Sequence, residues 1–256
     1  MPIFCSTVFR RVLLLAVLAA QFLGQTVQAA DAKPIRIILV GDSTMNTKTG
    51  YGDAMCALFK PDVKCINLAK GGRSSKSFRV EGLWDNVQKL LKDHEPFRAT
   101  YVLIQFGHND QPGKAERSTD LVIEFPVNIA RYVDEVKALG GTPVLVTPLT
   151  RRSFGSDGVH KNDLIPWADA IRLVAKNKSV PLIQLNDKSA AAVAAMGSIE
   201  ADTLAEEPPG NSTPSRFDHT HLGPKGASLF ANMMARELNS TVPEMAPHFD
   251  RQKLAK

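Results

Sequence analysis

Four short clusters of polar residues in this chain carry side chains that could perform nucleophilic or acid–base chemistry. The first is Gly41–Thr44, in which Ser43 follows an apolar run. A serine on the turn that leaves a buried strand can expose its hydroxyl group at the sheet edge and act as a nucleophile. The same residues could instead cap the next helix, because serine and threonine are favoured there. Taken alone, this cluster leaves both interpretations open.

The second and third clusters could supply hydrogen-bond donors. In Asn67–Ser74, the pair Gly71-Gly72 allows a tight turn that presents bare N–H groups to a ligand. A phosphate-binding loop is disfavoured because no Gly-Lys-Ser/Thr follows. In Phe106–Asp110, the Asn109 amide could donate a hydrogen bond to a developing oxyanion. The alternative for the second cluster is an ordinary structural turn, and the alternative for the third cluster is an Asx turn.

The fourth cluster, Asp218–Leu222, combines a carboxylate with two imidazoles. Asp218 and His221 lie three residues apart, so the carboxylate could orient the ring and stabilise its charged form. The alternative is a metal site made from Asp218, His219 and His221. We do not expect one, because the remaining histidines stand alone in the sequence. The role of His219 stays open, as a contributor either to structure or to the site.

Regular elements must bring these clusters together. Apolar runs rich in β-formers alternate with stretches of helical periodicity, which indicates a parallel sheet covered on both faces. We therefore predict an α/β fold, a three-layer α/β/α sandwich with about five central strands. In such sheets the site lies outside the carboxyl ends of the strands, and the first three clusters directly follow the first three runs. The predicted strands are 35–40, 63–68, 100–106, 143–147 and 181–185, and the predicted helices are 84–93, 121–140, 165–177, 188–196 and 224–239, with a loop at 208–215.

The first thirty residues have the pattern of a secretory signal. Arg10 and Arg11 precede an apolar run over 12–23, and Val27-Gln28-Ala29 supplies small residues for a cut after Ala29. About twelve apolar residues are too few to span a bilayer, which needs about 20. We expect a signal peptide at 1–29, a single domain at 30–256, export to the periplasm or medium, and no membrane insertion after cleavage.

Cysteine usage and composition agree with an exported globular protein. Cys56 and Cys65 remain after cleavage, and a pair in an oxidising compartment favours a disulfide over two buried thiols. The 256 residues are 44% hydrophobic and 22% charged, which excludes disordered and polytopic membrane classes. A formal charge of +5 without basic runs longer than two residues argues against a nucleic-acid partner.

Together, the four clusters resemble the SGNH (GDSL-like) hydrolase superfamily. Its four blocks match Ser43, Gly72, Asn109 and His221 in order. The chain looks most like rhamnogalacturonan acetylesterases of carbohydrate esterase family 12. That resemblance rests on four segments: Gly-Asp-Ser-Thr at 41–44, the second block at Asn67–Ser74, Gly-His-Asn-Asp-Gln at 107–111, and Thr147–Arg152. The α/β-hydrolase signature Gly-x-Ser-x-Gly is absent from the sequence.

The resemblance implies a flavodoxin-like SGNH fold and a serine esterase mechanism. Ser43 would be the nucleophile, His221 the base and Asp218 its orienting acid. The oxyanion would be bound by the backbone N–H groups of Ser43 and Gly72 and by the Asn109 amide. We expect no metal and no cofactor. The implied activity removes acetyl groups from a pectic polysaccharide such as rhamnogalacturonan. A broad-specificity periplasmic lipase, thioesterase or arylesterase is the alternative, and a non-catalytic carbohydrate-binding relative is a third reading.

An acidic polysaccharide suggests arginines in the binding site. Arg73 adjoins Gly72, while Arg151 and Arg152 follow the fourth strand and should lie at the same sheet edge. Arginine can bind a carboxylate through two parallel hydrogen bonds. The alternative is that all three are solvated surface charges or structural braces. We expect the partner to be an acetylated acidic polysaccharide or oligosaccharide, and the protein to be a monomer.

Overall fold

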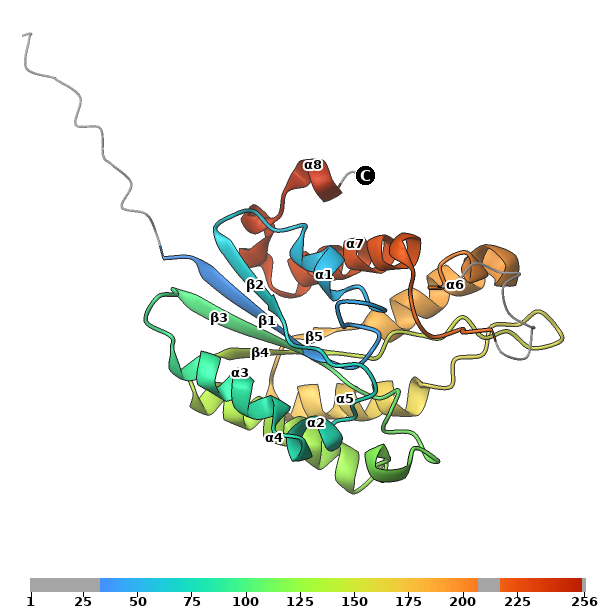
Figure 1. Ribbon diagram of the computed structural model, residues 1–256, viewed down its shortest axis with the longest axis horizontal. Coiled ribbons are helices and arrows are strands. Elements are labelled where there is room, and N and C mark those ends of the chain that lie inside the picture. The colour runs from blue at the N-terminus through green and yellow to red at the C-terminus, as the bar shows by residue number, and fades with distance from the viewer. Residues whose placement is uncertain (1–32, 207–216, 255–256) are drawn as a thin grey trace, which may run out of the picture. The chain divides into compact units, whose positions relative to one another are not determined.

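A computed structural model describes residues 33–206 and 217–254, which belong to one compact unit (Figure 1). The predicted signal peptide at 1–29 and the predicted loop at 208–215 lie outside the described residues. No helix in the two described ranges is long and apolar enough to cross a membrane.

A five-stranded parallel sheet forms the centre, with the order β2-β1-β3-β4-β5. The predicted α/β class and strand number are confirmed. The fifth strand is shorter than predicted, because Leu185 already belongs to the following helix. The strands are β1 (Ile35–Gly41), β2 (Val63–Asn67), β3 (Ala99–Gln105), β4 (Thr142–Val146) and β5 (Leu182–Ile183).

Strand β1 shows why the central strands carry apolar side chains on both faces. All seven of its residues are buried. Ile37 and Leu39 belong to one hydrophobic core, while Ile38 and Val40 belong to a second. Since successive side chains of a strand point to opposite faces, each face of the sheet needs its own apolar set.

Helices cover both faces of the sheet (Figure 1). The core on one face contains residues of α3, α4 and α5, and the core on the other contains residues of α1, α6 and α7. Helix α6 is longer than the predicted 188–196 and bends at Gly197, whose φ is +73°. The helices are α1 (Gly52–Cys56), α2 (Ser77–Val80), α3 (Leu83–Lys92), α4 (Glu124–Ala138), α5 (Ile165–Lys178), α6 (Leu185–Asp202), α7 (Pro224–Thr241) and α8 (Arg251–Leu254), with 3₁₀ turns η1 (Ala115–Arg117) and η3 (Pro243–His248).

A disulfide joins Cys56, at the end of α1, to Cys65 in β2. The two Cα atoms are 5.3 Å apart, within the ordinary range for such a bond. The bond ties the short helix that follows the Ser43 loop to the edge of the sheet.

Candidate active site

The carboxyl ends of the first three strands place three of the polar clusters side by side. Gly41 at the end of β1 pairs with Gln105 at the end of β3, and Leu39 pairs with Asn67 at the end of β2. Asn67 also donates a hydrogen bond to the carbonyl oxygen of Met45, 3.0 Å away, in the loop that follows Ser43. The loops that leave these strands therefore start from one edge of the sheet.

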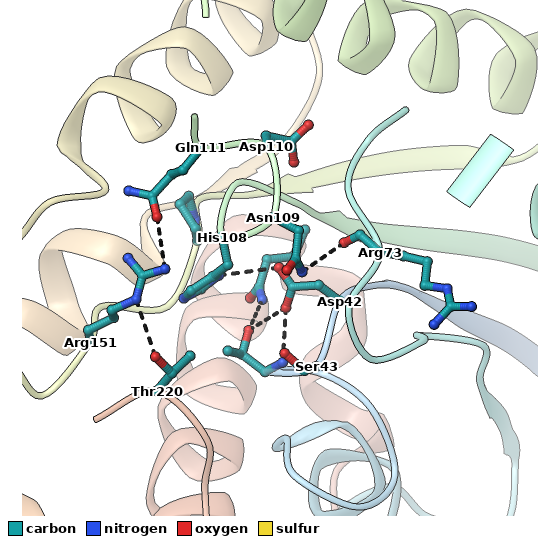
Figure 2. Close-up of polar contacts among 12 residues, drawn as sticks. Asp42, Ser43, Arg73, His108, Asn109, Asp110, Gln111, Arg151 and Thr220 are labelled. Atoms are coloured by element: carbon teal, nitrogen blue, oxygen red, sulfur yellow. Dashed lines mark hydrogen bonds and ion pairs between the residues drawn. The ribbon is translucent and has the colours of Figure 1, made fainter. Parts of the chain in front are cut away.

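Ser43 lies on a turn held by its buried neighbour Asp42. Asp42 Oδ1 accepts hydrogen bonds from Thr44 N at 2.9 Å and from Thr44 Oγ1 at 2.8 Å. Its Oδ2 lies 3.2 Å from His108 Nδ1 (Figure 2). Burial opposes ionisation of Asp42, but the charge and hydrogen bond of His108 and the Thr44 bonds outweigh it and lower its pKa. Ser43 itself is 8% exposed.

The two further oxyanion donors predicted from the sequence lie beside this turn. A side chain at Gly71 would reach within 3.7 Å of Ser43 Cβ, so the glycine turn lies against the serine. Gly72 has φ +78°, a conformation that favours glycine. Asn109 Nδ2 donates one hydrogen bond to the carbonyl oxygen of Arg73, 3.1 Å away (Figure 2). Its second N–H can serve a ligand.

Asp110 fixes the position of the glycine turn relative to Asn109. Its buried carboxylate accepts hydrogen bonds from Ser75 Oγ at 2.6 Å, Ser75 N at 3.1 Å and Thr119 Oγ1 at 3.1 Å. Burial raises the pKa of Asp110 to about 7, against the lowering effect of these bonds. The side chain beside Asn109 thus anchors the second loop, three residues beyond Gly72.

Asp218 and His221 form the carboxylate–imidazole pair that their spacing predicted. His221 Nδ1 lies 2.6 Å from Asp218 Oδ2, and Asp218 Oδ1 accepts bonds from the backbone N–H groups of Thr220 and His221. The bond between the two side chains holds the pKa of Asp218 far below its ordinary value and raises the pKa of His221. Because Nδ1 faces the carboxylate, Nε2 is the ring nitrogen left for proton transfer.

Backbone contacts connect this pair to the serine loop. Leu222 N donates to the carbonyl oxygen of Thr49 at 2.9 Å, and Thr49 Oγ1 donates to the carbonyl oxygen of Ser43 at 2.9 Å. The contacts described include no direct hydrogen bond between the Ser43 hydroxyl and His221. In ligand-free enzymes such bonds often tighten only when substrate binds.

His219 takes a different direction from His221. Its Nδ1 lies 3.5 Å from an Asp202 oxygen at the end of α6, and its ring packs edge-on against Phe217 at 5.0 Å between centroids. These contacts indicate a structural role. Within residues 33–206 and 217–254, no group of three His, Cys, Asp or Glu side chains could hold a metal ion.

The prediction that Arg152 binds substrate is wrong, because its side chain is only 1% exposed. Arg152 donates to the carbonyl oxygens of four consecutive residues. Nη2 lies 2.7 Å from the oxygen of Asp218 and 2.9 Å from that of His221, and Nη1 lies 3.4 Å from that of Thr220. The backbone N–H of Arg152 bonds to His219 O at 2.8 Å. Arg152 is therefore a brace of the loop that carries His221.

The other two predicted arginines already have carboxylate partners. Arg73 contacts Glu81, with 2.6 Å between Nη2 and Oε2. Arg151 pairs with Asp163, and it also donates to Thr220 Oγ1 at 3.2 Å and to Gln111 Oε1 at 2.8 Å (Figure 2). Arg151 thus connects the His221 loop to the Asn109 loop and has little remaining capacity for a substrate carboxylate.

Two residues that contact this site, His108 and Arg117, were not predicted from the sequence. His108 was visible in the third cluster, but only the fold shows its pairing with Asp42. Arg117 lies in η1, and its Nη1 donates to the carbonyl oxygen of Gly72 at 3.3 Å and to Asn109 Oδ1 at 3.4 Å. No strand or motif in the sequence marks Arg117, so no signal could have identified it.

This fold and this arrangement of serine, histidine, aspartate and predicted oxyanion donors are those of a class, the carboxylic ester hydrolases of the SGNH type. The chain belongs to the GDSL-like lipase/acylhydrolase family, whose model matches residues 38–229.

Two similar proteins are both named rhamnogalacturonan acetylesterases. The chain is 32% identical over 214 residues to a rhamnogalacturonan acetylesterase of Bacillus subtilis, a match that covers 79% of this chain and 89% of the relative. It is 28% identical over 219 residues to a rhamnogalacturonan acetylesterase of Emericella nidulans, a match that covers 77% and 81% of the two chains.

Solved structures agree on the fold. The Bacillus subtilis protein YxiM superposes with a TM-score of 0.66 at 25% identity; the match covers 84% of this chain but spans only 58% of that longer protein. An acetylxylan esterase of Geobacillus stearothermophilus superposes with a TM-score of 0.58 at 14% identity, covering 81% of this chain and 95% of that one. At this identity the second match shows the shared fold alone.

Proposed function

We propose that this protein is an acetylesterase that removes acetyl groups from a pectic polysaccharide such as rhamnogalacturonan, through an acyl-enzyme on Ser43. The observation that carries the proposal is the 2.6 Å contact between Asp218 and His221, in a loop tied to the Ser43 turn. Relatives named rhamnogalacturonan acetylesterases, which match over three quarters of this chain, support the substrate class.

In the first half of the reaction, Ser43 Oγ attacks the carbonyl carbon of the acetyl ester while His221 Nε2 takes the hydroxyl proton. Asp218 holds the ring in the tautomer with hydrogen on Nδ1 and stabilises the imidazolium that forms. The bond between the carbonyl carbon and the sugar oxygen then breaks, and the leaving hydroxyl takes the proton from His221. The acetyl group remains on Ser43 as an ester.

In the second half, water attacks the acetyl-serine. His221 accepts a proton from the water and returns one to Ser43 Oγ as acetate leaves. Both tetrahedral intermediates place negative charge on the former carbonyl oxygen. The N–H groups of Ser43 and Gly72 and the Asn109 amide would bind that charge, and removing one such donor lowers rates by about 100- to 1000-fold in serine hydrolases.

A panel of acetylated substrates tests the proposal. Acetate release should be fastest from acetylated rhamnogalacturonan oligosaccharides, and slower from acetylated xylan and chitin oligomers. Ser43→Ala should abolish release, while Ser240→Ala, a serine on α7 remote from the polar clusters, should retain it. Preferential hydrolysis of p-nitrophenyl esters with long acyl chains would contradict the acetylesterase proposal and favour a lipase.

A covalent label tests the acyl-enzyme separately. A serine-reactive sulfonyl fluoride should modify Ser43, as peptide mass spectrometry would show, and should leave His221→Ala unmodified because the hydroxyl then lacks its base. Equal labelling of the wild type and of Ser43→Ala would contradict the assignment of the nucleophile.

We also propose that the protein acts outside the cytoplasm. The pattern of residues 1–29 and the Cys56–Cys65 disulfide both support export, since disulfides persist in oxidising compartments. When the chain is expressed with its own N-terminus in a Gram-negative host, the periplasmic or medium fraction should contain protein that begins at Ala30. Full-length protein confined to the cytoplasm would contradict export.

A further inference from the structure

Arg117 lies beside the proposed oxyanion donors, and its hydrogen-bond partners differ from those of Arg73 and Arg151, which bind carboxylates. Its Nη1 donates to the Gly72 carbonyl oxygen and to Asn109 Oδ1, and its Nε donates to the Lys114 carbonyl oxygen at 3.4 Å. All three acceptors are neutral. In the part of the chain that the structure describes, no carboxylate oxygen lies within ion-pair distance of this guanidinium.

The free capacity of Arg117 is on Nη2. A guanidinium carries five N–H donors, and neither donor of Nη2 bonds to a described residue. Although Nη2 lacks a partner among the described residues, it is not buried, and solvent or a ligand can reach it. Arg117 therefore has no carboxylate partner among the described residues and keeps two donors open to a ligand, beside the groups proposed to bind the acetyl oxygen.

The loops around the proposed oxyanion donors also contain three lysines. Lys48, Lys70 and Lys114 form no ion pair with any described residue. Lys70 N bonds to the carbonyl oxygen of Gly41, and Lys48 precedes Thr49, whose hydroxyl bonds to Ser43 O. The acid of the same turn, Glu116, is exposed and pairs with none of them within the described ranges. Elsewhere many cations have acidic partners, for example Arg172 with Asp169 and Asp187.

We propose that Arg117 binds a carboxylate of the substrate, on the acetylated sugar or on a uronate next to it. The inference rests on the proposed function, because it assumes that the ester is carried by an acidic polysaccharide. Arginine suits this task because its planar donors match a carboxylate and its charge does not titrate near neutral pH. Lysines in the same loops would add attraction at longer range.

A pair of matched substrates isolates the contribution of the carboxylate. One is an acetylated rhamnogalacturonan oligosaccharide with free carboxylates, and the other is the same oligosaccharide with its carboxylates methyl-esterified. The wild type should prefer the free acid by about 10-fold or more in kcat/KM, the value of one charge-assisted hydrogen-bonded pair. In Arg117→Gln the preference should fall below about 2-fold.

The ratio between the two substrates is the informative quantity, because Arg117 also holds Asn109. A loss of that hydrogen bond lowers kcat on both oligosaccharides and cancels in the ratio. Arg236→Gln serves as the control: it removes the same formal charge from α7, where Arg236 bonds to the Asn232 carbonyl oxygen. It should keep the wild-type preference. An unchanged preference in Arg117→Gln would overturn the proposal.

A binding measurement separates this inference from the proposed function. A deacetylated oligosaccharide with free carboxylates should inhibit hydrolysis of p-nitrophenyl acetate, and Arg117→Gln should raise its inhibition constant about 10-fold or more. If the wild type releases no acetate from either oligosaccharide but shows this Arg117-dependent inhibition, the proposed function fails while the carboxylate site stands. If inhibition is absent or does not depend on Arg117, the carboxylate site is refuted.

Discussion

Arg152 Nη2 donates a hydrogen bond to the carbonyl oxygen of His221, 2.9 Å away, from a side chain that is almost wholly buried. The same residue satisfies the carbonyl oxygens of the three preceding positions, Asp218, His219 and Thr220. Arg152 thus binds four consecutive carbonyl oxygens of a loop without regular secondary structure, three of them through its side chain, and helps to orient the Asp218–His221 pair.

Replacing Arg152 should therefore disturb both stability and catalysis. In Arg152→Met the carbonyl oxygens of Asp218, Thr220 and His221 lose their side-chain donors, and a buried polar group left unsatisfied costs about 1–3 kcal/mol. We expect urea unfolding to show a loss of this size or more, and kcat on p-nitrophenyl acetate to fall about 10-fold or more because the His221 ring is less well oriented. Arg236→Met is the control. Full activity in a folded Arg152→Met protein would contradict the role of Arg152 in holding the His221 loop.

The pH dependence of hydrolysis should report the raised pKa of His221. The ring must be neutral to accept the Ser43 proton, so kcat/KM should rise through a pKa above 6.5, the ordinary value. Asp218→Asn removes the main cause of the shift. The acid limb should then move to lower pH, and the plateau should fall by about 10⁴-fold, as in serine proteases. An acid limb that stays in place or moves upward in Asp218→Asn would contradict this role.

Asp110 should make the free energy of unfolding depend on pH. Its pKa is about 7 in the folded protein and about 3.9 in an unfolded chain, so the folded state holds a proton that the unfolded state has lost. Stability from this residue therefore declines as pH rises from about 4 to about 7. Between pH 5 and pH 8, the stability of the wild type relative to Asp110→Asn should fall by on the order of 2 kcal/mol. Asp157→Asn, at an exposed aspartate, should show no such change.

Loss of the disulfide should destabilise the protein without abolishing its fold. Closing a nine-residue separation is worth about 2–3 kcal/mol by loop entropy. The double variant Cys56→Ser, Cys65→Ser should lose about this amount in urea unfolding. Thiol titration of the denatured, unreduced, mature protein should find no free thiol, whereas two free thiols would contradict the bond.

Much of the fold was predictable because the first three strands are mostly apolar and the polar clusters follow them at their carboxyl ends. Ser43, Gly72 and Asn109 could be placed together from that rule alone. The burial of Arg152 could not, because two adjacent arginines are equivalent in the sequence and only packing decides which one turns inward. Arg117 follows no strand, so its contact with Gly72 and Asn109 depends on the tertiary path of a loop.

The assignment of the base can be tested by one comparison between two neighbouring histidines. His221→Ala should lower the rate of p-nitrophenyl acetate hydrolysis by about 10⁴-fold or more while the protein remains folded, since the serine then has no base. His219→Ala should keep at least half of the wild-type rate, because its ring contacts Asp202 and Phe217. An inactive His219→Ala together with an active His221→Ala would contradict the proposed catalytic centre.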